Sequence, residues 1–312
     1  MFIHVRIPSC MPLYIRRLPT QEKVGLVDPK AVPANMTFFN PSRAGDVIYV
    51  RVTEHDGPTQ RNKALLFESA SKVSHTVESP YHLLAKTVNL FQGIEDLRLC
   101  WFEDKLWFTG TTTHASHEMR NELIVGYFNK RLTDVEYMST VDIGHLPVKN
   151  VSPFVWNGKL CMWDMFKMRI YEVEVPKAQE HAKLTAKIVR SFTYGPGLPT
   201  TSEPLRGSTS PIHLHGSTWG CVVHDIIFND TPMITFRLSY IHHWVEFDIE
   251  RGIITFISQP FFIAHWGIEY VSGIYQDPKD YEKITLYFGI EDKHAMQCTT
   301  RLHELRFGKA IR

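Results

Sequence analysis

Short runs in which β-branched and aromatic residues mix with polar ones dominate the chain, and turn residues separate them. The run Val47–Thr53 is typical of a strand and is followed by turn residues at Asp56-Gly57-Pro58. Two hairpins are predicted, over 99–108 and 154–163. In the second hairpin, Asn157-Gly158 favours a tight turn with both central residues at positive φ. The pattern therefore predicts an all-β fold.

Helical periodicity is weak, and one short helix is expected over Ala178–Val189. The segment Met1–Arg6 carries charge inside its only apolar run, so it resembles a first strand more than a signal peptide. No stretch approaches the roughly 20 apolar residues that a membrane helix needs. We therefore expect no membrane partner.

The charged residues are almost balanced, with 34 Lys and Arg against 33 Asp and Glu and a formal net charge of +1. This balance gives no support to polyanion binding, so no nucleic-acid partner is expected. A local cluster of cations could still bind one phosphate group. The cysteines are scattered and contain no Cys-x-x-Cys pair, which argues against a zinc site or a disulfide framework. A reducing, cytoplasmic location is favoured.

Five short polar segments, here called the polar landmarks, recur about every 55 residues. They are Asn40-Pro41-Ser42, Glu95-Asp96, Lys149-Asn150, Arg206-Gly207 and Ile268-Glu269. A repeat of this length suits a four-stranded propeller blade with generous loops. We therefore expect residues 1–312 to form a single five-bladed β-propeller, with the landmarks converging on a central active-site channel. A β-sandwich with evenly spaced turns is the alternative.

The landmarks belong to a longer series of motifs that follow one another in chain order. The series is Asn40-Pro41-Ser42 with Arg51, Gly93-Ile94-Glu95-Asp96-Leu97-Arg98, Lys149-Asn150 with Pro153-Phe154, Leu205-Arg206-Gly207-Ser208 with His224, Tyr240-x-His242-His243, Ile268-Glu269 and Gly289-x-x-Asp292. It resembles the β-1,2-mannoside phosphorylases of glycoside hydrolase family 130 and the related mannosyltransferase-phosphorylases of protozoan mannogen metabolism. The resemblance implies a five-bladed propeller enzyme that transfers mannose.

Two positions depart from the family's pattern. Leu97 replaces the proline that usually follows the acidic pair, so the backbone is less restricted there. Val151-Ser152 stands where many relatives carry an aromatic residue, which suggests a different sugar specificity.

Making or breaking a glycosidic bond needs an acid for the leaving oxygen. By resemblance, Asp96 is that proton donor and acts through a sugar hydroxyl. Glu95 would raise the proton affinity of Asp96 if the two carboxyls share a dry site. Because adjacent strand residues point to opposite faces, Glu95 could instead hold the backbone or Arg98.

The nucleophile in this class is inorganic phosphate, which needs cations. The resemblance places Lys149, Arg206 and His224 together as the phosphate site, with Tyr240 as a hydrogen-bonding partner. The same groups could hold the diphosphate of a nucleotide sugar such as GDP-mannose. The residues expected to bind sugar are Asn40, Arg51, Glu95, Arg98, Asn150, Glu269 and Asp292. No cofactor and no metal ion are expected.

The expected function is mannosyl transfer. The enzyme would release mannose 1-phosphate from β-1,2-mannosides by phosphorolysis, run that reaction in reverse, or extend a β-1,2-mannan from GDP-mannose. Its partners would be mannooligosaccharide, mannose 1-phosphate, inorganic phosphate and GDP-mannose. An inverting hydrolase and a non-catalytic glycan-binding propeller are the alternatives. The phosphate-binding trio argues against the first, and the presence of Asp96 argues against the second.

Overall fold

The computed structural model describes residues 2–5, 13–28, 30, 32–56, 59–68, 74–78, 91–112, 121–144, 149–174, 184–198, 204–228 and 238–308. Within these ranges the fold is nearly all β, as the pattern predicts, with one four-residue helix, α1 (Leu302–Leu305). No helix in this described part of the chain has the length and apolar composition of a membrane-spanning segment.

The helix expected over Ala178–Val189 is wrong where it falls on described residues. Leu184–Ser191 is a strand, β16, which pairs antiparallel with β15 (Arg169–Val173). Several of its residues are β-branched, a property that suits a pleated strand better than a helix. Pairing with a distant neighbour therefore outweighs the weak helical pattern.

The first sheet is an antiparallel meander with one short parallel strand. It contains β4 (Met36–Ala44), β5 (Val47–Asp56), β6 (Thr59–Glu68) and β7 (Ser74–Glu78), and β8 (Phe91–Gln92) pairs in parallel with β6. The strand predicted over Val47–Thr53 is confirmed as part of β5.

The second sheet joins two antiparallel meanders. They are β9 (Glu95–Phe102), β10 (Lys105–Thr112), β11 (Glu122–Phe128) and β12 (Val135–Asp142), then β13 (Ser152–Trp156), β14 (Lys159–Asp164), β15 and β16. The meanders join where β12 and β16 pair in parallel. Both predicted hairpins are confirmed here, and Asn157 and Gly158 have φ of 52° and 69°.

The two remaining sheets contain the rest of the strands. The third has β1 (Phe2–Val5), β2 (Leu13–Arg17), β17 (Thr193–Tyr194), β18 (Arg206–Gly207), β19 (Ile212–His215), β20 (Thr218–Phe228), β21 (Leu238–Asp248), β22 (Ile253–Ile257) and β23 (Phe261–Phe262). The fourth has β24 (Glu269–Asp277), β25 (Asp280–Ile290), β26 (His294–Arg301) and β3 (Gln21–Gly25). Because β3 pairs with β26, an early strand completes the last sheet.

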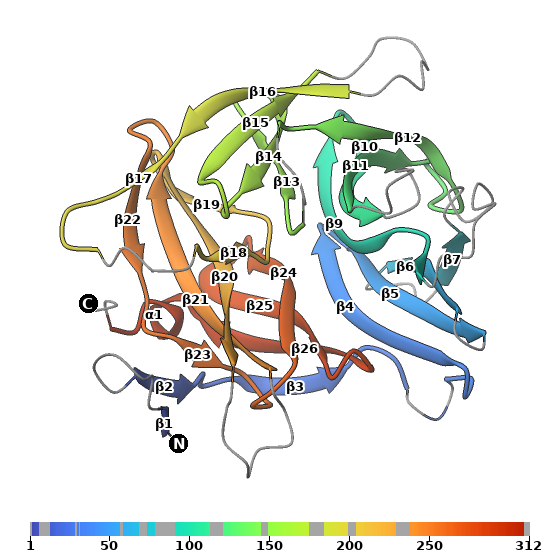
Figure 1. Ribbon diagram of the computed structural model, residues 1–312, viewed down its shortest axis with the longest axis horizontal. Helices are drawn as coiled ribbons and strands as arrows, with labels where there is room; N and C mark the ends of the chain where they lie inside the picture. Colours follow the sequence, from blue (N-terminus) through green and yellow to red (C-terminus); the bar gives the residue numbers. More distant parts are fainter. Residues whose placement is uncertain are drawn as a thin grey trace.

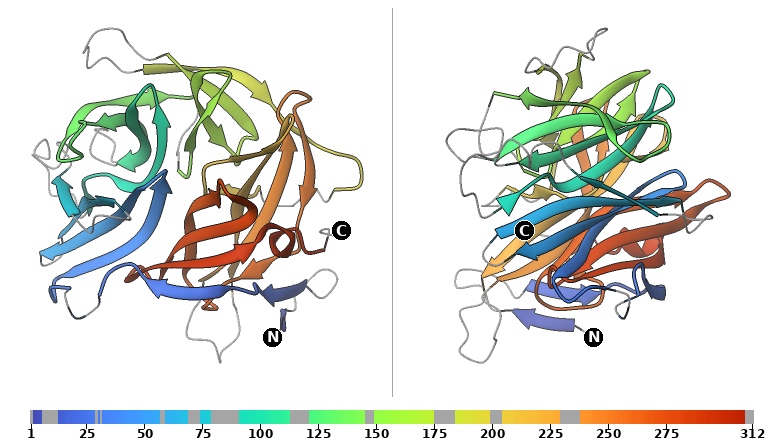
Figure 2. Two further views of the ribbon diagram at one scale, coloured as in Figure 1. Left: turned by 180° about the vertical axis from the view of Figure 1, so that it is seen from behind. Right: turned by 90° about the vertical axis from the view of Figure 1, so that its right-hand side faces the viewer.

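The sheets follow one another around a common centre (Figure 1). The strands that carry or follow the polar landmarks, β4, β9, β13, β18 and β24, lie nearest that centre, and Figure 2 shows the same arrangement from behind and edge-on. Hydrogen bonds join neighbouring inner strands: Ser42 Oγ donates to the Leu97 carbonyl (2.9 Å), and Ser272 Oγ donates to the Pro41 carbonyl (2.8 Å). The landmarks are thus brought together by the way the sheets surround the centre.

The sheets pack against each other through apolar clusters. Between the second and third sheets, the rings of Trp163 and Phe247 stack with their centroids 4.6 Å apart, and Phe192 meets both edge-on. Trp163 and Phe247 have no exposed surface, so burial of this aromatic group removes a large apolar area from water.

Replacing Phe247 by Ala should lower the free energy of unfolding by about 3–5 kcal/mol, because it opens a cavity in this cluster. Phe166 is 40% exposed, so Phe166→Ala is a matched control that should cost less than about 1 kcal/mol. Urea unfolding of both variants measures the difference. Equal losses would show that the sheets do not depend on this contact.

Candidate active site

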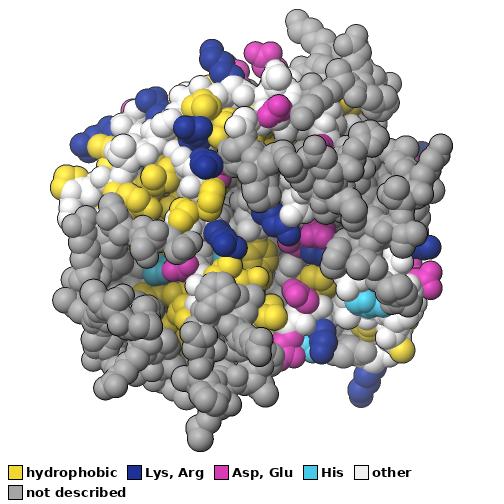
Figure 3. All heavy atoms as spheres, in the orientation of Figure 1, with side chains coloured by type: hydrophobic (Ala, Val, Ile, Leu, Met, Phe, Trp, Pro, Cys, Tyr) yellow, Lys and Arg dark blue, Asp and Glu magenta, His cyan; other side chains and the backbone are white. Residues whose placement is uncertain are grey.

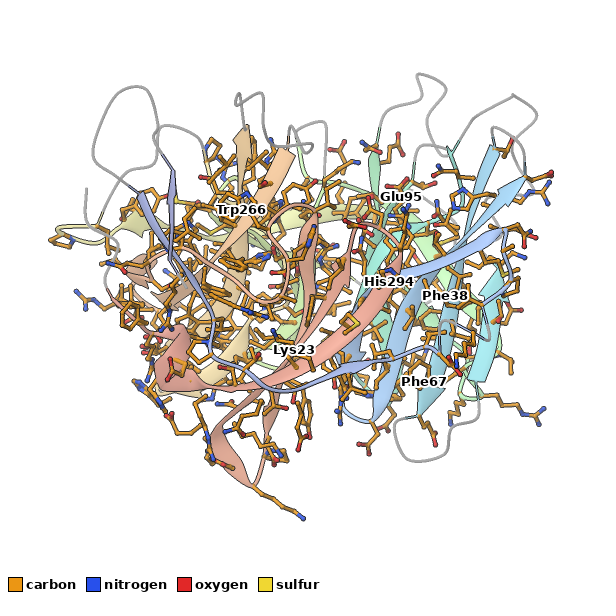
Figure 4. The ribbon with its side chains drawn as sticks, turned by 90° about the horizontal axis from the view of Figure 1, so that it is seen from below. Lys23, Phe38, Phe67, Glu95, Trp266 and His294 are labelled. Carbon is orange, nitrogen blue, oxygen red and sulfur yellow. The ribbon has the colours of Figure 1, made fainter. Side chains whose placement is uncertain are left out.

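A polar pocket of about 630 Å³ lies where the inner strands meet. Its lining residues are Thr37, Phe39, Asn40, Arg51, Thr53, His55, Gln60, Glu95, Asp96, Asn121, Lys149, Asn150, Arg206, His224, Tyr240, Tyr270 and Asp292. The molecular face in Figure 3 is hollowed near its centre, and acidic and basic side chains gather there. Glu95 lies toward the upper end of the strands in Figure 4, opposite Phe67, so it marks the end at which the pocket lies. The pocket contains every predicted site residue except Arg98 and Glu269.

Two β-bulges aim the central side chains. In β9 the register slips so that Asp96 and Leu97 lie opposite the single residue Gly110. In β4 a similar slip falls between Phe39 and Ser42. Because a bulge turns a side chain away from the regular alternation, Asp96 and its neighbour Glu95 both line the pocket. The alternative in which Glu95 faces away from Asp96 is therefore wrong.

The pocket is also marked by a repeated backbone conformation. Asn40, Asp96, Asn150 and Asp292 have φ of 47°, 53°, 62° and 51°. Asn and Asp adopt this left-handed region more readily than other residues with a Cβ atom. The residue types at these positions thus suit a conformation that directs the side chain into the pocket.

Asp96 is held by two donors from the first sheet. Its Oδ1 accepts hydrogen bonds from Arg51 Nη1 (2.9 Å) and Asn40 Nδ2 (2.8 Å). Burial by itself would raise the pKa of Asp96, but the charges of Arg51 and Arg98, together with these bonds, outweigh burial and lower the pKa below its ordinary value. A net rise in the proton affinity of Asp96 is therefore not observed, because the arginine charges outweigh burial, and Glu95 itself faces Arg51 at 3.6 Å.

The predicted anion-binding residues all line the pocket. Arg206 in β18 pairs in register with His224 in β20, and Lys149 and Tyr240 line the same space. We call Lys149, Arg206, His224 and Tyr240 the anion arm. Lys149 Nζ lies 3.9 Å from a Glu95 carboxylate oxygen, so the anion arm adjoins the acidic pair.

His224 contributes a neutral ring to the anion arm and no positive charge. Burial, and then the neighbouring His242 and Arg206, lower its pKa well below the ordinary value, so the ring is neutral near pH 7. Its Nδ1 lies 2.8 Å from Ser208 Oγ. This corrects the expectation of three cations and leaves the positive charge to Arg206 and Lys149.

Arg98 lies behind the pocket wall and positions other residues. It is 2% exposed, and it donates to the Ser208 carbonyl (2.7 Å), the Asp96 carbonyl (2.7 Å), Asn150 Oδ1 (2.9 Å) and the Tyr270 hydroxyl. Direct sugar binding by Arg98 is therefore corrected to a positioning role, because its donors are used inside the protein.

Glu269 is also turned away from the pocket. It has no exposed surface, and its carboxylate accepts backbone N–H groups of Ile263 (2.6 Å), Ala264 (2.7 Å) and His265 (2.9 Å). His242 Nε2 lies 3.6 Å from the same carboxylate. Sugar binding by Glu269 is thus corrected to a structural role, because these internal partners occupy the carboxylate.

The two departures from the family's motifs are explained by burial. Leu97 is 3% exposed and belongs to the apolar cluster between the first and second sheets, so its side chain fills core space beside Asp96. Val151 and Ser152 are buried and do not line the pocket, and the Val151 carbonyl accepts a hydrogen bond from Thr109 Oγ1 (2.7 Å). Val151 and Ser152 therefore cannot set the sugar specificity by touching a sugar in the pocket.

Several lining residues were not found from the sequence. They are Thr37, Phe39, Thr53, His55, Gln60, Asn121 and Tyr270. The only signal for those in β5 is the two-residue step from Arg51 to Thr53 and His55, which places three side chains on one face of a strand.

No family model matches the sequence, and no curated protein matches it. Solved structures do match, and mannoside phosphorylases of glycoside hydrolase family 130 are among these structural neighbours. A mannose phosphorylase from Leishmania mexicana in complex with a phosphate ion gives a TM-score of 0.59 at 13% identity, over 94% of this chain and 92% of the other.

Two further neighbours have related descriptions. A GDP-Man-dependent mannosyltransferase from Leishmania mexicana gives a TM-score of 0.57 at 12% identity, over 94% of both chains. A β-1,2-mannobiose phosphorylase from Listeria innocua, in complex with β-1,2-mannobiose, gives 0.52 at 14% identity, over 89% of this chain and 94% of the other. At these identities the likeness establishes a shared fold.

The opposite pKa shifts of two pocket carboxyls predict opposite effects on stability. Asp96 has a lower pKa in the folded protein than its value of 3.8 in the unfolded chain. The ionised Asp96 therefore stabilises the fold above pH 3.8, and this stabilisation is lost as the pH falls through the folded-state pKa. Asp96→Asn should therefore cost about 1.5–3 kcal/mol at pH 7, and less in the acid range.

Asp292 is the matched control, because burial and the nearby Asp96 carboxylate raise its pKa. An acid with a raised pKa destabilises the fold once it ionises, so Asp292→Asn should leave stability at pH 7 unchanged or higher. Urea unfolding at pH 7 and at pH 3–4 distinguishes the two variants. The same pH trend in both would contradict this account of the pocket's charges.

Proposed function

We propose that this protein is a five-bladed β-propeller enzyme that transfers mannosyl groups. Its reaction would be reversible phosphorolysis of β-1,2-mannosides, with mannose 1-phosphate as the phosphorylated sugar, or mannosyl transfer from GDP-mannose. The observation that carries the proposal is a single pocket that holds the acidic pair Glu95 and Asp96 next to the anion arm. The motif resemblance and the descriptions of the structural neighbours support mannose as the sugar.

The sheet pairing supports five blades. The units β4–β7, β9–β12 and β13–β16 are each a four-stranded meander, and β20–β22 with the short inner strands β18 and β19 forms another unit. The fifth is β24–β26, to which β3 adds the outer strand. Closure of the ring by an early strand would hold the first and last blades together.

The chemistry follows from what each side of the pocket can bind. In phosphorolysis, a phosphate oxygen held by Arg206 and Lys149 attacks the anomeric carbon while the bond from that carbon to the leaving sugar oxygen breaks. The leaving oxygen takes a proton that originates on Asp96 and passes through a sugar hydroxyl, so this direction requires Asp96 to be protonated first, which its lowered pKa opposes. In the transfer direction Asp96 accepts the proton from the acceptor, and its lowered pKa keeps it ionised for that role.

Mannosyl transfer from GDP-mannose would use the same residues. Arg and Lys bind a diphosphate as readily as phosphate. Hydrolysis would need no anion arm, so the pair of cations favours phosphoryl-bearing co-substrates over water.

The discriminating assay incubates the protein with β-1,2-mannobiose, with and without phosphate, and separately with mannose and either mannose 1-phosphate or GDP-mannose. Phosphate-dependent release of mannose 1-phosphate supports phosphorolysis, extension from GDP-mannose supports transfer, and free mannose without phosphate supports hydrolysis.

Asp96→Asn should reduce turnover by about 10²–10⁴-fold, because the amide can neither give nor take the proton. The side chain keeps its shape, and a melting curve and circular dichroism spectrum check that the fold is kept. Turnover close to that of the wild type would remove Asp96 from the mechanism.

Arg206→Ala should raise the KM for phosphate, or for the sugar donor, by about tenfold or more, because a charge-assisted hydrogen bond to the anion is lost. The control is Lys159→Ala, which removes a surface cation that pairs with Glu172 outside the pocket. Phosphate saturation curves test both variants. An unchanged KM in Arg206→Ala would exclude it from the anion arm.

A further inference from the structure

A buried histidine and a buried glutamate lie next to the anion arm, and the proposed chemistry uses neither. His242 in β21 pairs in register with His224 in β20, so the two imidazole rings project from the same face of neighbouring strands. His224 lines the pocket, whereas His242 has no exposed surface and is not part of the lining. His242 Nε2 lies 3.6 Å from a carboxylate oxygen of Glu269 in β24. Three titratable groups therefore lead from the pocket into the core.

Glu269 is ionised although it has no exposed surface. Burial would raise its pKa, but His242 and the backbone N–H groups of Ile263 and Ala264 outweigh burial and lower the pKa below its ordinary value. A buried carboxylate still needs a compensating positive charge. Lys23 Nζ donates to the Ile263 carbonyl (3.1 Å). In the described part of the chain, the ion-pair partner of Glu269 is His242.

The ring of His242 is placed to supply that charge. Among the described residues, Nδ1 has no hydrogen-bond partner, and the Glu269 oxygen lies just beyond hydrogen-bond distance of Nε2. The ring packs against Phe261, with the two centroids 5.8 Å apart. A neutral ring would leave the carboxylate without a countercharge, and an imidazolium provides one. The extra proton therefore belongs on His242.

The other titratable groups around this pair do not compete for that role. His243 follows His242 in the strand and so faces the opposite side, where its Nδ1 lies 2.9 Å from the Ser258 carbonyl oxygen. Burial lowers the pKa of His243. Cys298 lies near Glu269, and burial raises its pKa to about 12, so the thiol is neutral near pH 7.

The surroundings of His224 oppose an extra proton on its ring. Burial lowers its pKa most, and the neighbouring His242, Arg206 and Arg98 lower it further. His224 thus has positive groups where His242 has a carboxylate. Two adjacent rings therefore differ in protonation because Glu269 lies against only one of them.

Uncharged groups also surround the His224 ring. Tyr240 and Tyr270 meet it edge-on, with centroid distances of 5.3 Å and 5.2 Å. Burial raises the pKa of both tyrosines, so their hydroxyls are neutral near pH 7. Ser208 Oγ lies 2.8 Å from His224 Nδ1. The ring is therefore held by neutral groups, and an extra charge on it would have no partner there.

We propose that His242 and Glu269 form a buried ion pair that acts as a positioning unit for the anion arm, by keeping the proton away from His224. The ion pair stands on its own geometry, and its consequence for anion binding rests on the proposed function. Charges on both rings would repel each other in a site without water, so the ring beside the carboxylate keeps the proton. His224 then lines the pocket uncharged, and Arg206 and Lys149 attract the anion.

The first test records the ring nitrogen shifts of the histidines by NMR between pH 5.5 and 8. In the wild type at pH 7, His242 should carry protons on both nitrogens and His224 on one. His242→Gln keeps an amide that can donate to Glu269 but removes the charge, so His224 should become protonated at higher pH than in the wild type. Glu269→Gln should act in the same direction. His213→Gln, an exposed position outside the lining, should leave His224 unchanged.

A second measurement links the ion pair to anion binding. The probe is sulfate, because its charge is constant over this pH range. At pH 5.5, His242→Gln should bind sulfate about three- to tenfold more tightly than the wild type, since a protonated His224 adds a charge-assisted hydrogen bond. At pH 8 the two proteins should bind it equally. Comparison at one pH cancels the titration of Asp292, whose pKa is raised by burial.

The results that contradict the ion pair differ from those that contradict the proposed function. A neutral His242 ring in the wild type at pH 7 would overturn the proposal even if no variant folded. An unchanged His224 titration in a folded His242→Gln would do the same, and equal sulfate binding at pH 5.5 would remove the positioning role. Failure of every protein to bind sulfate would instead contradict the proposed phosphate site and leave the ion pair intact. Melting curves check that each variant folds.

Discussion

The contact of Asp96 with Arg51 and Asn40 is the interaction on which the centre of the molecule depends. A carboxylate so largely enclosed by protein must replace its water with charges and hydrogen-bond donors, or it would not remain ionised. The donors come from the first sheet and Asp96 comes from the second. The site's central charge is therefore satisfied only when the two sheets are packed together.

Arg98 makes the same kind of link on the far side of Asp96. Its guanidinium joins the Asp96 backbone to Ser208, Asn150 and Tyr270, which lie on or beside three other inner strands. A buried guanidinium has five N–H donors to satisfy, so it fixes the distance between these strands. The acidic centre and the anion arm are thus parts of one hydrogen-bonded framework, and ligand binding does not have to create it.

The sequence predicts which residues belong near this site but not where their side chains point, as Arg98 and Glu269 show. The motifs predict that Arg98 and Glu269 bind sugar, because Glu269 is part of a landmark and Arg98 lies close to one. Both side chains instead make their hydrogen bonds inside the protein. A motif gives residue type and order, but not the direction in which a side chain points. That direction depends on bulges such as the one at Asp96, which appear only when a strand is aligned with its partner.

The sequence by itself determined the strands, the Asn157-Gly158 hairpin and the recurrence of the landmarks, because these depend on the conformational preferences of neighbouring residues. Tertiary structure decided the ionisation of Asp96, the neutrality of His224 and the gathering of the landmark residues around one pocket. Desolvation and charge proximity are set by groups that are distant along the chain. Those distances become short only after the sheets close around the centre.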